Sequence, residues 1–166
     1  MNNAGIKAIE PFGPGSCCIV GYGNSHRQDD GLGPYVAALA KSALEGCPGI
    51  KLLACLQLET DLLEELKEAD TVILVDATGE RIPEGRRWER IEPRPDRASS
   101  FSHSLQPDLL MGLLGLLYQK YPAGWLVSVQ GEDFGLGEGL TPEAEARARQ
   151  VVADLEKLVS KVEKKN

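Results

Sequence analysis

The chain has 166 residues, of which 42% are hydrophobic and 26% charged, and this balance is typical of one soluble globular domain. Its net charge of −7 leaves no basic stripe to neutralise phosphates, which argues against a general nucleic-acid binder. We predict a single domain over residues 1–166, whose first 16 residues form a loose leader rich in glycine, proline and asparagine.

The sequence predicts neither a secretion signal nor a membrane span. The N-terminus lacks a basic segment followed by an apolar run, and no stretch reaches the apolar length that crosses a bilayer. The cysteines have no C-x-x-C spacing and are expected to be reduced, buried thiols: Cys17, Cys18, Cys47 and Cys55. These features predict a cytoplasmic protein without a membrane partner.

Strand and helix signals alternate along the chain. Strands are predicted at residues 17–20, 51–58, 71–76 and 125–129, with a weaker edge strand at 87–91. Helices are predicted at residues 33–44, 61–68 and 104–121, with a last one that starts after Thr141. Thr60 and Thr141 are the expected N-caps, and Pro142 suits the first turn of the last helix. This order predicts an α/β fold, a three-layer α/β/α sandwich around a mostly parallel sheet of about five strands.

The loop after the first strand concentrates the polar chemistry. It contains glycines followed by the adjacent acids Asp29 and Asp30, just before a helix. Open α/β sheets build ligand sites at the carboxyl ends of their strands, and a helix N-terminus keeps carboxylates ionised. Two adjacent acids seldom do the same job, so one of them is expected to cap the helix. The loop therefore predicts metal binding or acid/base chemistry.

Two further residues are expected at the same edge of the sheet. Asp76 ends the most apolar strand, and His103 precedes the third helix. Two carboxylates and one imidazole with open positions can hold a divalent transition metal. The alternatives are an Asx turn at Asp76, and an exposed or capping role for His103. His26 is expected to face solvent and is the weaker candidate.

Other enzyme classes fit the sequence poorly. Gly21-x-Gly23 begins a dinucleotide fingerprint, but its third glycine is replaced by His26. The second strand ends at Gln57 and Leu58 rather than at the acid that would bind a ribose. The chain also lacks a Walker A motif and a G-x-S-x-G nucleophile elbow, which disfavours P-loop and serine-hydrolase chemistry.

Five landmarks together resemble the [NiFe]-hydrogenase maturation endopeptidases, which process the hydrogenase large subunit. They occur in family order and cover nearly the whole domain: Gly21-Tyr-Gly-Asn24, Asp29-Asp30-Gly-Leu-Gly33, Asp76-Ala, Ser102-His-Ser-Leu105 and Gly137-Glu-Gly-Leu-Thr-Pro142. The segment Leu56-Gln-Leu-Glu-Thr60 departs from the pattern of some members, which leaves the client hydrogenase and the role of Gln57 open.

The resemblance implies removal of a C-terminal extension from the large-subunit precursor after nickel insertion. It also implies that Asp30, Asp76 and His103 are both the metal ligands and the catalytic residues. The nickel would arrive with the precursor, although another divalent metal could occupy the site. Asp29 would then cap the helix and hold the loop, while Gly21 and its neighbouring glycines would let the precursor tail approach.

Several points stay open at this stage. Hydrolysis could proceed through metal polarisation of the carbonyl or through a carboxylate acting as general base. Two other classes of function compete with the protease: a small-molecule metallohydrolase and a non-catalytic hydrogenase-assembly chaperone.

Overall fold

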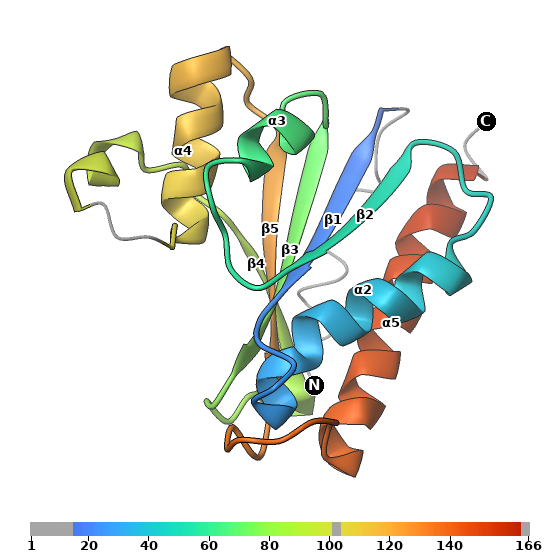
Figure 1. The fold of residues 1–166 in the computed structure, drawn as a ribbon. Helices are drawn as coiled ribbons and strands as arrows, with labels where there is room; N and C mark the ends of the chain where they lie inside the picture. The colour runs from blue at the N-terminus through green and yellow to red at the C-terminus, as the bar shows by residue number, and fades with distance from the viewer. Residues whose placement is uncertain (1–14, 101–103, 164–166) are drawn as a thin grey trace.

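A computed structural model describes residues 15–100 and 104–163 (Figure 1). The strands are β1 (Cys17–Tyr22), β2 (Ile50–Cys55), β3 (Thr71–Thr78), β4 (Arg86–Arg90) and β5 (Ala123–Gln130). The helices are α2 (Leu32–Ala43), α3 (Leu62–Leu66), α4 (Pro107–Tyr118) and α5 (Pro142–Glu163), with 3-10 turns η1 (Gln28–Gly31), η2 (Pro83–Gly85) and η3 (Pro95–Ser100).

The strands form a five-stranded sheet in the order β2-β1-β3-β5-β4. Every neighbouring pair is parallel except β4 with β5, which is antiparallel. The mostly parallel sheet is therefore confirmed, and so is the predicted edge strand, which is β4. Because β1, β3 and β5 run the same way, their carboxyl ends meet at one edge, where Gly21 pairs with Val75 and Asp76 with Ser128.

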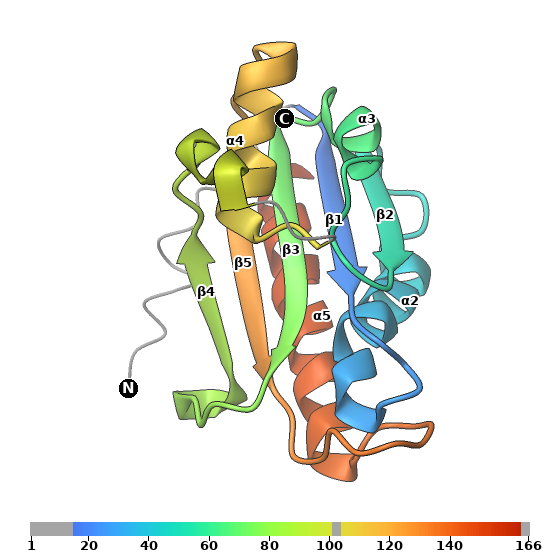
Figure 2. The same cartoon turned by 60° about the vertical axis from the view of Figure 1, so that its left-hand side comes forward.

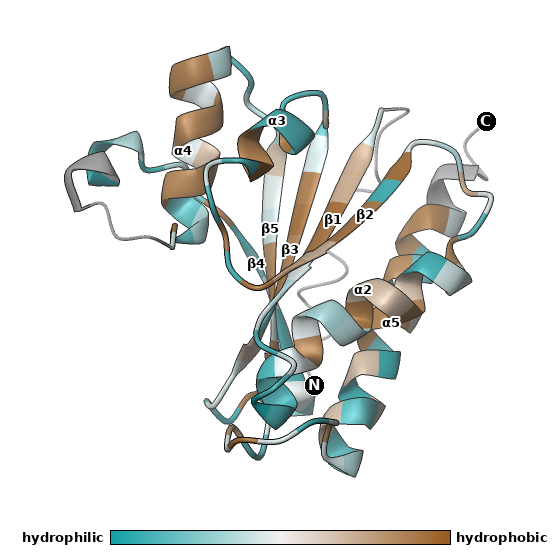
Figure 3. Cartoon of the chain, viewed as in Figure 1, coloured by the Kyte–Doolittle hydropathy of each residue, from teal (hydrophilic) through white to brown (hydrophobic). Residues whose placement is uncertain are grey.

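Helices cover both faces of this sheet, which confirms the predicted three layers. Helices α2 and α5 lie on one face, and α3 and α4 lie on the other (Figures 1 and 2). Each face has its own apolar cluster, centred for example on Ile73 and Leu155 on the first and on Leu74 and Leu110 on the second. Burying a side chain of this size stabilises the fold by about 1.5–3 kcal/mol. Apolar colour covers much of α4, whereas α5 mixes apolar and polar positions (Figure 3).

Two predicted helix starts are wrong. The third helix begins at Pro107 instead of residue 104, because a proline suits the first turn and Gln106 is still extended. Asp61, rather than Thr60, precedes α3, and no side chain caps that helix. The predicted cap at Thr141 is confirmed, because the Ala144 N–H in the first turn of α5 donates to the Thr141 hydroxyl at 3.3 Å.

The predicted leader is not loose at its end. The Ser16 N–H donates to the Asp70 carboxylate at 2.9 Å, and the Ser16 hydroxyl donates to the Glu68 carbonyl at 2.8 Å. These bonds tie the entry of β1 to the entry of β3. Residues 1–14 lie outside the described residues, so the leader stays a prediction there.

The four cysteines are free thiols. Cys17 and Cys18 are buried as predicted, and burial raises the pKa of Cys18 to about 11. The predicted burial of Cys47 and Cys55 is wrong, since both are only partly buried. The burial of Cys17 and Cys18 agrees with small packing groups rather than reactive thiols. Over the described ranges, no helix has both the length and the apolar character needed to cross a membrane.

Candidate functional site

Close packing of glycines brings the acidic turn to the ends of the central strands. A Cβ on Gly33 would lie 2.3 Å from the Tyr22 carbonyl oxygen and 2.6 Å from that of Val75. A Cβ on Gly21 would lie 1.9 Å from the Gly33 oxygen. Only glycine permits this approach of α2 to β1 and β3. The prediction that Gly21 and its neighbouring glycines let the precursor tail approach is wrong for Gly21 and for Gly33, because the chain's own backbone fills the space beside both.

Asp30 lies in η1, at the end of the loop that follows β1. Its carboxylate accepts a hydrogen bond from the Asn24 N–H at 2.8 Å, and its own N–H donates to the Arg27 carbonyl at 3.1 Å. Gly23 passes directly beside it, with a φ of 145° and no space for a side chain against the Asp30 carbonyl. The side chain is only partly buried, so it remains available to a ligand.

Asp76 lies inside β3 rather than at its end, because the strand continues to Thr78. The predicted Asx-turn alternative is therefore wrong. Burial raises the pKa of Asp76 to about 6, a hydrogen bond with the Tyr22 hydroxyl opposes this rise, and the charge of Asp30 adds to it. The structure thus brings Asp30 and Asp76 within electrostatic reach of each other at the carboxyl edge of the sheet.

The third predicted ligand, His103, lies outside the described residues, so its position relative to Asp30 and Asp76 is not tested. Just after it, the Leu105 N–H donates to the Leu58 carbonyl at 2.8 Å, which fastens the entry of α4 beside the segment that follows β2. Among residues 15–100 and 104–163, no three His, Cys, Asp or Glu side chains are grouped so as to hold a metal ion.

Two other polar residues that the sequence singled out each pair with a surface acid. His26 is exposed as expected, with its side chain 77% accessible and Nδ1 3.3 Å from the Glu138 carboxylate. The Gln57 amide donates to the Glu59 carboxylate at 2.7 Å. Neither contact gives these residues a part in the chemistry of the edge.

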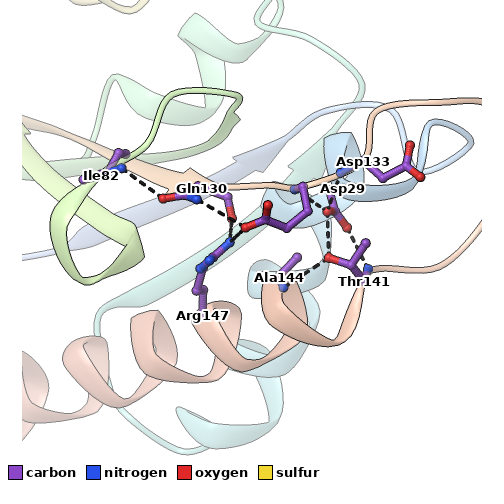
Figure 4. Close-up of polar contacts among 8 residues, drawn as sticks. Asp29, Ile82, Gln130, Asp133, Thr141, Ala144 and Arg147 are labelled. Carbon is purple, nitrogen blue, oxygen red and sulfur yellow. Dashed lines mark hydrogen bonds and ion pairs between the residues drawn. The ribbon is translucent and has the colours of Figure 1, made fainter.

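Asp29 has quite different surroundings from its neighbour. Its carboxylate is fully buried and accepts backbone N–H groups of Glu132 at 2.7 Å, Asp133 at 3.0 Å and Thr141 at 2.8 Å, besides the Thr141 hydroxyl at 2.8 Å (Figure 4). Burial alone would raise the pKa of Asp29, but these hydrogen bonds lower it below its ordinary value. The predicted helix cap is wrong, since no side chain caps η1 or α2. Asp29 holds the loop before α5 instead.

Two contributions to the site were not predicted from the sequence. Tyr22 directs its hydroxyl to Asp76, and the only available signal was a polar aromatic residue at the end of an apolar strand. The loop over residues 131–141 supplies the donors to Asp29. Its glycines and acids mark a loop, but nothing local marks its partner.

A hollow of about 350 Å³ lies elsewhere, between the end of β4, η3 and the start of α4. Its lining includes Arg94 and Arg97 but neither of the candidate acids of the sheet edge. Arg94 is paired with Asp96 at 3.1 Å and Arg97 with Asp108 at 3.2 Å. Because Arg94 and Arg97 are already paired and neither Asp30 nor Asp76 lines this hollow, the sheet edge is the better candidate site.

Comparison with solved structures gives the same fold for several proteins of one kind. The [NiFe] hydrogenase maturation protease HycI from Thermococcus kodakarensis KOD1 superposes with a TM-score of 0.70, at 22% identity over 87% of this chain and 92% of that one. The chain has the fold of the [NiFe]-hydrogenase maturation proteases. The hydrogenase maturating endopeptidase HybD from E. coli gives a TM-score of 0.62 at 20% identity, over 84% of this chain and 89% of that one.

An endopeptidase from Escherichia coli solved in solution also matches, with a TM-score of 0.62 at 24% identity over 86% of this chain and 93% of that one. No family model and no curated protein sequence matches the chain. The structural likeness therefore confirms the fold that the sequence landmarks implied, and the activity is argued from the site.

Proposed function

We propose that this chain is an endopeptidase that removes the C-terminal extension from a [NiFe]-hydrogenase large-subunit precursor after nickel insertion. The observation that carries the proposal is the convergence of Asp30 and Asp76 at the carboxyl edge of a sheet whose fold is that of hydrogenase maturation proteases. The ordered landmarks in the sequence support the same activity, and we further propose that the protein acts in the cytoplasm.

In this proposal nickel is part of the substrate. The precursor brings the ion, and Asp30, Asp76 and His103 complete its coordination and thereby seat the extension at the sheet edge. Carboxylate and imidazole are suitable ligands for nickel, provided that each is deprotonated. With a pKa of about 6, Asp76 is mostly ionised at neutral pH and can meet that requirement. Another divalent ion could use the same ligands.

The peptide bond next to the docked nickel is then hydrolysed. Two routes remain compatible with the residues: polarisation of the scissile carbonyl by the metal, or activation of water by a carboxylate acting as general base. The protein's own contribution in both routes is to hold two carboxylates at fixed positions.

The test is mass spectrometry of a nickel-loaded large-subunit precursor incubated with and without the protein. The proposal expects the loss of one C-terminal peptide, dependent on the protein. An intact precursor bound in a stable complex would instead identify a chaperone. An intact, unbound precursor, with a metal retained by the purified protein, would indicate a small-molecule metallohydrolase.

A further inference from the structure

Two loops at the sheet edge are fastened along their length. The loop over residues 131–141 runs beside the segment over residues 24–31. The Gln28 N–H donates to the Gly137 carbonyl, the Gly137 N–H to the His26 carbonyl, and the Asp29 N–H to the Asp133 carbonyl, each at 2.9 Å. These bonds join stretches of chain more than a hundred residues apart.

The buried Asp29 side chain joins the same two segments through further hydrogen bonds. The three N–H groups and one hydroxyl that it accepts all belong to the 131–141 loop. Thr141 immediately precedes α5, so the carboxylate also lies at a helix N-terminus, where negative charge is favoured. Packing is tight here, since a Cβ on Gly131 would lie 2.8 Å from the Asp29 Cβ.

Asp30, the candidate ligand, extends from the same short turn. Its N–H donates to the Arg27 carbonyl, and the Arg27 guanidinium in turn donates to the Phe134 carbonyl at 3.3 Å. The chain just before Asp29 is thus attached to the 131–141 loop at His26, Arg27 and Gln28, and Asp30 is bonded in turn to Arg27. A loss of the Asp29 contacts would release the turn that sets the direction of Asp30.

We infer that Asp29 is a positioning residue, which locks the 131–141 loop to the 24–31 segment and thereby fixes the backbone that carries Asp30. The inference rests on the proposed function, because its effect is read in precursor cleavage. The Asp29 oxygens are occupied by donors from the loop, so the side chain is not proposed to contact the substrate.

The chain offers a matched control for this role. Asp154 is the other buried acid in the part of the chain that the structure describes, and it is 2% exposed. It pairs with Arg86 through two hydrogen bonds of 2.5 and 3.1 Å, between α5 and β4. An Asp154→Asn change therefore alters a similarly buried, hydrogen-bonded carboxylate, and it leaves the contacts between the 131–141 loop and the 24–31 segment in place.

The experiment compares Asp29→Asn and Asp154→Asn on nickel-loaded precursor, at a temperature where circular dichroism shows both variants folded. A misplacement of about 1 Å costs up to about a hundredfold in rate, so Asp29→Asn is expected to lower kcat about ten- to a hundredfold with little change in KM. Amide exchange at Glu132, Asp133 and Thr141 should accelerate in the same variant. Asp154→Asn should keep the wild-type kcat and the wild-type exchange at these amides.

Three results would overturn the inference: an unchanged kcat in folded Asp29→Asn, unchanged amide exchange at the loop, or an equal loss of kcat in Asp154→Asn. A wild-type protein that cleaves no precursor would refute the proposed function itself, and these failures are therefore distinguishable. Should Asp29→Asn fail to fold, Thr141→Val and Thr141→Ser replace it. The valine removes the hydroxyl that donates to Asp29 and caps α5, and it should lower kcat, whereas the serine keeps both contacts and should keep the wild-type kcat. Equal kcat values in the two variants would overturn the inference.

Discussion

Asp29 and Asp76 lie at the same edge of the sheet, yet their environments shift their pKa values in opposite directions. Asp29 receives three backbone N–H groups and one hydroxyl, and these lower its pKa despite burial. In Asp76 burial dominates over the hydrogen bond with Tyr22, and its pKa rises to about 6. The comparison teaches which acid serves the fold and which is available to a ligand.

The physical reason is the balance between desolvation and donors. A buried carboxylate surrounded by donors is stabilised in its charged form and has no spare capacity for a substrate. A half-buried carboxylate with few donors, such as Asp76, keeps part of its desolvation cost, which a cation or a proton can relieve. The contacts of Asp29 therefore stabilise the fold, and we propose that Asp76 is the site residue, although the sequence alone presents both as acids at the same edge of the sheet.

The largest expected effect is a loss of precursor cleavage when one of the candidate ligands is changed. Asp30→Asn, Asp76→Asn and His103→Ala should each lower the rate of precursor cleavage by at least about a hundredfold, because each removes a ligand or general base. The rate is measured by mass spectrometry on variants shown to be folded. Glu80→Gln, which changes an exposed acid just after β3, is the control and should cleave normally. Normal cleavage by any of the three variants would remove its residue from the site.

The next effect is on stability through Asp29. Asp29→Asn should lower the free energy of unfolding at pH 7 by about 2–4 kcal/mol, because buried N–H groups lose their charged acceptor. Since the folded-state pKa lies below the ordinary 3.8, the Asp29 contribution is present above that pH and is lost as the pH falls through the folded-state value. Urea unfolding should show that wild type and Asp29→Asn differ less in their free energy of unfolding at pH 3 than at pH 7. An equal difference at both values would contradict the assigned role.

The contribution of Asp76 to the free energy of unfolding should depend on pH in the opposite direction. Its folded-state pKa of about 6 exceeds the ordinary 3.8, so the folded state binds more protons between these values and loses stability as the pH rises through them. Asp76→Asn removes this loss and should be more stable than wild type at pH 7.5 by roughly 1–2 kcal/mol, with the difference gone below pH 4. Urea unfolding across this range measures it. A variant less stable than wild type at pH 7.5 would show that Asp76 is also a scaffold acid.

The smallest expected effect concerns Tyr22. Tyr22→Phe removes a hydrogen bond that holds down the pKa of Asp76, so that pKa should rise by up to about one unit. The acid limb of the pH–rate profile for cleavage should move up by the same amount, with a rate near wild type at pH 8.5. NMR titration of the Asp76 carboxyl checks the shift without substrate, and an unchanged midpoint in both measurements would exclude this role for Tyr22.

Much of the fold was predictable because its signals are local. The apolar run at residues 71–76 identifies the central strand, and Thr141-Pro142 identifies the start of α5. One helix boundary was predicted wrongly although a local residue marks it. The sequence pattern places the start of the third helix at residue 104, whereas Pro107 provides the actual first turn.

The site was predictable only in part, for a related physical reason. Strand ends in a parallel sheet meet at one edge, which predicted that Asp30 and Asp76 approach each other. The partners of Asp29 are more than a hundred residues away in the sequence, and they are mostly backbone N–H groups, which carry no residue-type signal. Only the structure could show that Asp29 binds the 131–141 loop and does not cap a helix. His103 remains a prediction.

The most direct test of the central claim compares cleavage of nickel-loaded and nickel-free precursor by the wild-type protein, with Asp30→Asn alongside. The account predicts that the extension is released from the nickel-loaded precursor only, and that Asp30→Asn releases it from neither. Efficient release from the nickel-free precursor would contradict recognition of nickel at the Asp30–Asp76 edge.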